Sequence, residues 1–581
     1  MNKKGFTLVE LLAVIAILAL LVIVALPSVL EMFNRAKKEI FLNEAKTVYK
    51  EVSKKYISES MRGNKLKNID SSLNKLDIDT DKLSYDIKLD DSGVIKDFKV
   101  SDGTYCIRTR ISDIKSLTYE LIEEGDCEGN PYAPEPVKCT YDGKLVQGAE
   151  FVQGSYTYRY KQEGSNLDDG EPIGWHNIYN DGWGVQLTDK SSTSPVSGEI
   201  CSSINGKPIV STNAMYRYSH ASSIDLSNFN SSSVTNMNSM FLESAATEII
   251  GLEKLDTHNV TTMGNMFNGS KAKTLDLVNF NTKKVKYMDN MFKSTEANKL
   301  DLSSFNTNNV IRLYAMFWES SALVIDGLEF FNTSKVTSME HMFRDSKALT
   351  LDLSSFDTSN VTSFLCFLAW SNATKIIGLE NFDTSSAVDM NAMFYGTQVE
   401  TLNLSNFDTS NVTGMGAMFM YNRSKILDVS SFDTRNVTNM DIMFMNTKAT
   451  EIRGLENFNT SKVTNMGSMF WGTEVSKLDL SNFDTSNVTD MSGMFAVSDA
   501  TIIDVSSFDT RKVTKMDQMF RNCHVKNLDI SSFDISDEVN LENMFWDSNS
   551  NIVYVKNNDI VNLFENSDVI NIPKYLKIVV K

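Results

Sequence analysis

The chain has 581 residues, of which 74 are Asp or Glu and 56 are Lys or Arg, so its formal net charge is −18. An acidic chain lacks the surplus of cations that phosphate contacts require, which excludes nucleic-acid binding driven by bulk charge. Hydrophobic residues make up 42% of the sequence, a globular composition that excludes general disorder.

A short basic head precedes an apolar segment over residues 6–30, whose single charged residue is Glu10. At about 1.5 Å rise per residue, a helix of this length spans the hydrocarbon core of a bilayer. We therefore predict a transmembrane helix over 6–30, with the bulk of the chain outside the cell. A carboxylate inside a membrane is costly, which indicates that Glu10 has a partner or a function.

The segment Gly5-Phe6-Thr7-Leu8-Val9-Glu10 resembles the processing site of type IV pilins and pseudopilins. The resemblance implies that a prepilin peptidase removes the leader peptide, residues 1–5, by cutting between Gly5 and Phe6, and then methylates Phe6. It also implies that Glu10 pairs with the N-terminal amine of a neighbouring pilin subunit, and that the helix bends near Pro27. A plain membrane anchor is the alternative, but it leaves Glu10 without a role.

The helix is expected to continue to residue 62, because apolar residues recur every three to five positions between charged ones, at Ile40, Ala45, Val48, Val52 and Tyr56. Residues 63–130 alternate weakly between apolar and polar side chains, which predicts the small antiparallel sheet of a pilin. Helix 6–62 and sheet 63–130 together make up the predicted pilin part.

Four cysteines suggest two disulfides in the extracellular part. Cys106 and Cys127 flank a strand of the predicted sheet and are one candidate pair. Residues 131–138 form a Pro-rich linker, and residues 139–220 a small β-rich domain in which Cys139 and Cys201 are the second candidate pair. Four cysteines allow three pairings, so the connectivity stays open.

The chain from residue 221 to 548 is an internal repeat. No proline occurs between residues 209 and 572, which favours one continuous architecture. A Met-Phe pair or a close substitute recurs every 25 or 26 residues and defines thirteen units, whose marker residues are Phe241, Phe267, Phe292, Phe317, Phe343, Leu368, Phe394, Phe419, Phe444, Phe470, Phe495, Phe520 and Phe545.

Within each unit, Val, Met, Met and Phe lie at steps of three, three and one, which places them on one face of a short helix. An Asx-Thr-Ser-Asn segment before them suits a turn and a helix N-cap. Each unit is therefore predicted to be a strand, a turn and a short helix, and the stacked units bury one continuous core. In the four 26-residue spacings, Gly251, Gly327, Gly378 and Gly454 predict a local bend.

These units resemble the BspA-like leucine-rich repeat surface proteins of bacteria, in which Leu-Asp-Leu-Ser-Ser-Phe-Asp-Thr-Ser-Asn-Val-Thr-x-Met-x-x-Met-Phe recurs. The resemblance covers residues 221–548 and implies a solenoid at the cell surface, often linked to adhesion. Two strand-like runs within residues 549–581 predict a cap, because an open solenoid end is an exposed edge. The expected fold class is multidomain α+β: a pilin helix with a small antiparallel sheet, a β-rich unit and a leucine-rich-repeat-like solenoid.

Two further cysteines lie within the repeats. Three residues after the marker the repeat carries a column of small polar residues, which we expect to face inward and to bond turn backbone. Cys523 replaces a hydroxyl in this column and is expected to be buried and unreactive, whereas Cys366 lies in a variable column and is expected to be an exposed thiol.

The sequence contains no catalytic, metal-binding or phosphate-binding motif, so we expect neither enzyme activity nor a cofactor. A column of aspartates from Asp225 to Asp529 leaves two interpretations, a solvated edge and a calcium site. In units seven to ten, the residue after the marker is apolar: Tyr395, Met420, Met445 and Trp471. Neighbouring units then carry a contiguous stripe, a candidate ligand-binding site, unless these side chains fold onto the flank of the solenoid.

The predicted function is that of a minor type IV pilin-like protein, inserted through its helix among other pilin subunits. The precursor is expected in the cytoplasmic membrane, and the mature protein at the cell surface or in a pilus. There the solenoid binds an unidentified extracellular protein or glycan, and no nucleic acid. The alternatives are a membrane-anchored structural stalk and a pseudopilin of a secretion or DNA-uptake machine.

Overall fold

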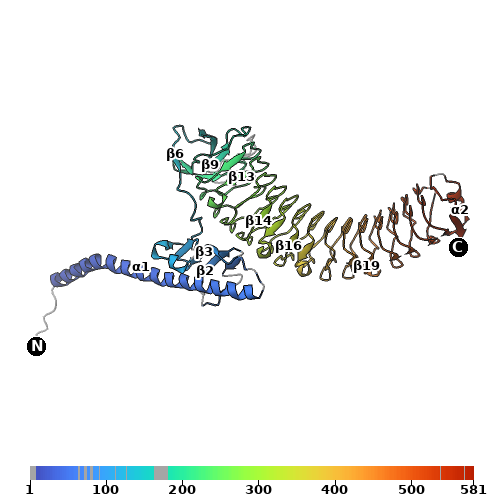
Figure 1. Ribbon diagram of the computed structural model, residues 1–581, viewed down its shortest axis with the longest axis horizontal. Coiled ribbons are helices and arrows are strands. Elements are labelled where there is room, and N and C mark those ends of the chain that lie inside the picture. The colour runs from blue at the N-terminus through green and yellow to red at the C-terminus, as the bar shows by residue number, and fades with distance from the viewer. Residues whose placement is uncertain are drawn as a thin grey trace, which may run out of the picture. The chain divides into compact units, whose positions relative to one another are not determined.

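The computed structural model describes residues 8–581 except 63, 65, 71–74, 79–82, 91, 112, 126, 163–180, 537 and 568, with side chains described from residue 32 onward. The chain divides into two compact units, Met1–Pro131 and Tyr132–Lys581 (Figure 1). The predicted processing residues Gly5 and Phe6 lie outside the described residues. Glu10 and Pro27 belong to helix α1 (Leu8–Met61), but their side chains lie outside the described part.

The first unit pairs helix α1 with a five-stranded antiparallel sheet in the order β1-β2-β3-β4-β5 (Figure 1). The strands are β1 (Asn68–Asp70), β2 (Ser84–Leu89), β3 (Ile95–Ser101), β4 (Tyr105–Thr109) and β5 (Glu123–Glu124), with 3₁₀ turns at Ile114–Ser116 and Tyr119–Leu121. Among the helices that the structure describes, none combines the length and the apolar character needed to cross a membrane.

One stripe of α1 packs on the sheet. Ala45, Val48 and Val52 are buried as their spacing predicts, and the stripe begins at Phe41, because Ile40 is 60% exposed. Helical residues three or four apart share a face, so Phe41 continues this stripe and Ile40 does not. The expectation for Ile40 was wrong by one position.

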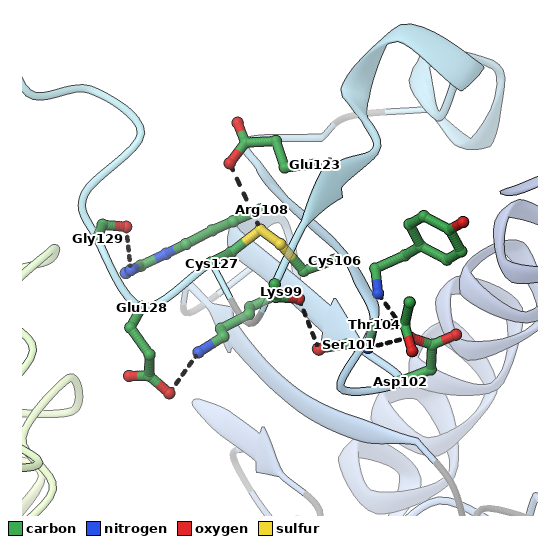
Figure 2. Close-up of a disulfide and its surroundings, with 12 residues drawn as sticks. Lys99, Ser101, Asp102, Thr104, Cys106, Arg108, Glu123, Cys127, Glu128 and Gly129 are labelled. Atoms are coloured by element: carbon green, nitrogen blue, oxygen red, sulfur yellow. Dashed lines mark hydrogen bonds and ion pairs between the residues drawn. A yellow bond between two sulfur atoms is a disulfide. The ribbon is translucent and has the colours of Figure 1, made fainter. Parts of the chain in front are cut away.

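The end of the first unit is fixed by a disulfide between Cys106 of β4 and Cys127, whose Cα atoms lie 5.8 Å apart (Figure 2). Around it, Lys99 pairs with Glu128 at 3.2 Å, and Arg108 Nη1 donates to the Gly129 carbonyl at 3.0 Å. The segment after β5 is therefore tied to the sheet by one covalent and two polar contacts.

The second unit opens with a six-stranded mixed sheet in the order β6-β10-β11-β9-β8-β7. Its strands are β6 (Lys138–Cys139), β7 (Glu150–Gln153), β8 (Tyr156–Lys161), β9 (Gly182–Leu187), β10 (Ser203–Ile204) and β11 (Lys207–Ser211). Cys139 and Cys201 form its disulfide, and Trp183 is fully buried. This sheet and the repeats share one hydrophobic core, and Tyr216 stacks on Phe241 at 5.4 Å, so the stack begins one turn before residue 221.

The repeats form a β-solenoid, in which each unit is one rung. Short strands of neighbouring rungs pair in parallel and in register. They are β12 (Ser223–Asp225), β13 (Glu248–Ile250), β14 (Lys299–Asp301), β15 (Val324–Asp326), β16 (Thr350–Asp352), β17 (Lys375–Ile377), β18 (Ile426–Asp428), β19 (Glu451–Arg453), β20 (Lys477–Asp479), β21 (Ile502–Asp504) and β22 (Asn527–Asp529). The Met columns and the marker phenylalanines fill the core, where successive phenylalanine rings stack, as at 5.4 Å between Phe241 and Phe267.

The short helix predicted around each Met-Phe pair is wrong. The segment is a run of turns: Met266 N–H donates within the rung to the Met263 carbonyl at 3.2 Å, whereas Phe267 N–H donates to the next rung at Met291, at 2.9 Å. Asn265 has a left-handed φ of 56°, as does the equivalent residue of the other rungs. Repeated turns give the same three-residue periodicity as a helix, and stacking supplies backbone partners that an isolated helix would find within itself.

The predicted N-cap role of the Asx-Thr segment is also wrong, because no helix follows it. Instead, a buried threonine joins adjacent rungs: the Thr409 hydroxyl donates to the Asp433 carbonyl at 3.0 Å and accepts the Asp433 N–H at 2.8 Å. The same contact recurs at Thr257, Thr282, Thr307, Thr434, Thr485 and Thr510. The column thus stabilises the stack in place of capping a helix.

The four predicted bends are present as left-handed glycines followed by a 3₁₀ turn. Gly251, Gly327, Gly378 and Gly454 have φ between 83° and 97°. The turns that follow are η3 (Leu252–Lys254), η4 (Leu328–Phe330), η5 (Leu379–Asn381) and η6 (Leu455–Asn457). Each turn accommodates the extra residue of its rung while the strand before it stays in register.

The C-terminal end is closed by β23 (Ile552–Val555), helix α2 (Asn558–Glu565) and β24 (Lys577–Val580). The two strands extend β22 in parallel, which confirms the predicted capping strands. Helix α2 was not predicted; its Phe564 meets Phe545 at 5.5 Å and ends the stack of rings.

Candidate functional site

The four predicted stripe residues lie on consecutive rungs. Backbone bonds keep this column in register, for example Gly396 N–H to the Met420 carbonyl at 2.7 Å and Tyr421 N–H to the Met445 carbonyl at 2.9 Å. Tyr395, Met420, Met445 and Trp471 are all half-buried. The stripe therefore exists as a column, although each side chain leans partly onto the flank of the solenoid.

A second aromatic column, one position further along, was missed by the sequence analysis. Trp370 and Tyr421 are each 39% exposed. Trp370 lies 4.9 Å from Tyr395 and 5.8 Å from Tyr421 between ring centroids, and Tyr395 lies 6.1 Å from Tyr421. We call these three residues, Trp370, Tyr395 and Tyr421, the aromatic patch; it extends over three rungs and is partly exposed to solvent.

A glycine makes room for the tryptophan of the patch. Gly396 has a left-handed φ of 65°, and a Cβ built there would lie 2.4 Å from Trp370 Cε3. Gly493, at a different repeat position, likewise lies close to Trp471, and a Cβ built there would lie 2.7 Å from Cε3. A glycine in the same column 26 residues after Trp370 was thus the sequence signal for this close contact.

A groove of about 610 Å³ adjoins the aromatic patch on the same rungs. Its residues follow the marker by four and six positions, and Gln398 Nε2 donates to the Gly396 carbonyl at 2.7 Å, which links the groove wall to the patch. We call this the polar groove; it is lined by Asn372, Thr374, Gln398, Glu400, Arg423, Lys425 and Lys448.

The polar groove carries more cations than its acidic surroundings suggest. Lys448 pairs with Glu474 at 2.8 Å. Arg423 and Lys425 are exposed and have no ion-pair partner among the described residues, while Glu400 is the one acid lining the groove. A surplus of cations without ion-pair partners attracts anions.

Trp318, which directly follows the marker Phe317, occupies the same repeat position as Tyr395 and Trp471 on a rung closer to the N-terminus. Lys293 Nζ lies 3.6 Å from its ring centroid, and the Arg344 guanidinium carbon lies 4.9 Å from it. His341 stacks on the indole at 5.2 Å, and burial lowers the pKa of this histidine. From rung three to rung ten this column thus holds the cations Lys293 and Arg344 together with the aromatic residues Trp318, Tyr395 and Trp471.

The aspartate column serves turns. Asp428 Oδ1, for example, accepts the Ser430 N–H at 3.1 Å, and hydrogen bonds from Ser430 lower the pKa of Asp428. Within the described ranges, the one cluster of possible metal ligands is Cys106, Glu123 and Cys127. Its two sulfurs are joined in a disulfide and cannot act as thiolate ligands.

Comparisons with known proteins bear on both ends of the chain. A model described as prokaryotic N-terminal methylation motif matches residues 1–26, which include Gly5, Phe6 and Glu10. The comparison with curated proteins gave no match. Among solved structures, the crystal structure of the pneumococcal vaccine antigen PcpA is similar, with 11% identity over 75% of this chain and 100% of that chain and a TM-score of 0.31. A likeness this weak carries no functional argument.

The repeats match a second family model, described as Mycoplasma protein of unknown function, DUF285, over residues 210–326, 296–373, 365–453 and 443–558. These four matches together span residues 210–558, more than half of the chain. The N-terminus thus carries the methylation signal of type IV pilins, and the solenoid that follows places the chain in the DUF285 family.

Proposed function

We propose that the protein is a minor pilin-like subunit of the cell surface that uses its solenoid to bind an extracellular ligand, and that it acts by binding and not by catalysis. The observation that carries this proposal is the N-terminal methylation motif, which runs directly into helix α1. Residues 41–52 of α1 pack on a small sheet. In the proposal, the apolar segment 6–30 packs against other subunits.

Processing by a prepilin peptidase is the first step of the proposal. Cleavage after Gly5 frees the amine of Phe6, and the Glu10 carboxylate of one subunit then neutralises the amine of a neighbour. Pairing of the two charges offsets the cost of burying each in an apolar environment. A large solenoid on every subunit would crowd a filament shaft, which favours a low-copy or tip position.

Replacing Glu10 by alanine in the full chain tests assembly. We expect the amount of E10A protein in sheared filaments to fall at least tenfold, while its amount in the membrane fraction is unchanged. Glu39→Ala is the matched control, because Glu39 is an exposed carboxylate of the same helix outside the apolar segment, and it should assemble normally.

Two results would contradict the proposal. Mass spectrometry of the mature protein should show a methylated Phe6 at its N-terminus, and recovery of protein that still carries residues 1–5 rules out processing. Unchanged filament levels of E10A, or a wild-type protein that is displayed on cells but never sheared off with filaments, would support the membrane-anchored stalk instead.

A further inference from the structure

The ligand of the solenoid can be narrowed by the chemistry of the aromatic patch and the polar groove. We propose that this surface binds an acidic polysaccharide, a glycan chain bearing carboxylate or sulfate groups. The inference rests on the proposed function, in which the solenoid faces the outside of the cell, and it names the class of ligand.

The aromatic patch supplies the stacking surface. Aromatic rings carry a negative face, which attracts the polarised C–H bonds on the apolar face of a sugar ring. The stacked pair Trp370 and Tyr421, with ring planes inclined by 28°, is partly exposed and offers aromatic surface on rungs whose backbones are hydrogen-bonded to one another. Because Trp370 rests on Gly396, this surface exists before any ligand binds, so little side-chain entropy is lost on binding.

The polar groove supplies partners for hydroxyl and anionic groups. Asn372, Thr374 and Gln398 line the groove with two side-chain amides and a hydroxyl. Arg423 and Lys425 project from one rung as exposed cations without an ion-pair partner among the described residues, in a chain whose net charge is −18. Charged hydrogen bonds to carboxylate or sulfate are stronger than neutral ones, so these two residues favour an acidic sugar over a neutral one.

The dimensions favour a chain of sugars over a single one. The groove residues come from four consecutive rungs, which at the strand spacing of about 4.8 Å extend over roughly 15 Å. A protein partner would require an interface of about 1,000 Å² or more, whereas three rings and one groove form a compact site.

Isothermal titration of the full-length protein in detergent tests the proposal, with oligosaccharides of hyaluronan and of heparin as acidic probes and dextran oligosaccharides as the neutral probe. We expect at least one acidic probe to bind at least tenfold more tightly than dextran, and the binding to weaken as salt is raised. Failure of both acidic probes to bind at millimolar concentration, or equal affinity for dextran, overturns it.

Variants locate the site. Trp370→Ala and the pair Arg423→Ala with Lys425→Ala should each weaken binding at least tenfold, whereas Trp370→Phe should retain most of it. Trp546→Ala and the pair Arg511→Ala with Lys512→Ala are controls, because they remove an exposed tryptophan and two exposed cations elsewhere on the solenoid.

Wild-type affinity for the acidic probes in the folded Trp370→Ala and Arg423/Lys425 variants would refute the location of the binding site. An equal loss of affinity in the control variants would refute it as well. Circular dichroism melting confirms that each variant is folded. Filament assembly of E10A is measured separately, so failure of glycan binding and failure of the pilin-like function are distinguished.

Discussion

Replacing Gly378 by alanine perturbs the contact between two rungs at a single point. Gly378 has a left-handed φ of 88°, and a Cβ built there would lie 2.4 Å from Ser354 Cα and 2.5 Å from Ser354 N. Both are backbone atoms of the preceding rung, which is held by the hydrogen bond from Leu353 N–H to the Ile377 carbonyl at 2.8 Å. The rung therefore has little freedom to move away from the new methyl group.

The cost follows from two contributions. A residue other than glycine in the left-handed region costs about 1–2 kcal/mol. Forcing a methyl group against fixed backbone costs about 1–3 kcal/mol more, as overpacking does in cores. We therefore expect G378A to lower the free energy of local opening by about 2–5 kcal/mol. Gly467 is the matched control, since it is not left-handed and its nearest neighbour is a side-chain atom, Asn465 Oδ1, at 3.2 Å.

Native-state hydrogen exchange is the appropriate assay, because a stack of repeats opens in parts and not as one unit. In G378A, the amides of β16 and β17 should exchange at least about 30-fold faster, since 1.4 kcal/mol corresponds to a factor of ten. Gly467→Ala should change exchange by less than tenfold, because alanine is tolerated where the backbone is compatible. Wild-type exchange rates in G378A would refute the reasoning, as would an equal acceleration of exchange in G378A and Gly467→Ala.

Three further predictions concern buried polar groups and thiols. Thr409→Val leaves the Asp433 N–H without its partner and should cost about 1–3 kcal/mol, whereas Thr409→Ser keeps the hydroxyl; equal melting temperatures of the two variants would contradict this. Burial raises the pKa of Cys523 to about 11, so at pH 8 its thiol stays protonated and iodoacetamide should label it only in denaturant, as mass spectrometry can show; labelling of the folded chain at the rate of a free thiol would argue otherwise. The Cys139–Cys201 disulfide joins cysteines with a sequence separation of 62, and in the chain-entropy model it stabilises the folded state by about 4 kcal/mol. Its reduction should therefore speed proteolysis at the start of the second unit. An unchanged rate of cleavage would show that the hydrophobic core alone keeps this region folded.

The repeat could be read from the sequence because its core is periodic. The marker phenylalanines and Met columns are buried, as their spacing predicts, and Cys523 is buried among small polar residues. The backbone of the Met-Phe segment could not be read in the same way. Steps of three fit a helix and a run of turns equally, and the alternation of left-handed residues such as Asn265 leaves no clear mark in composition.

The candidate site was only half visible in the sequence. The stripe of Tyr395 and Trp471 followed from one column, but the contact of Trp370 with Tyr421 joins residues two rungs apart. Predicting this contact requires knowledge of how the rungs align and of the room that Gly396 leaves for the Trp370 ring. Cys366 shows the same limit: it was expected to be exposed, but it is half-buried, and burial raises the pKa of its thiol.

The direction of the bonds between rungs has a mechanical consequence. Bonds such as that from Phe267 N–H to the Met291 carbonyl join one rung to the next, so tension along the stack is carried by all rung boundaries in series and the boundaries are expected to fail one after another. A rung that detaches releases 25 or 26 residues, which stretch to at most about 80–90 Å. Under a pull, the solenoid lengthens stepwise as an extensible tether, and the Cys139–Cys201 bridge stops the unravelling where the polypeptide enters the stack.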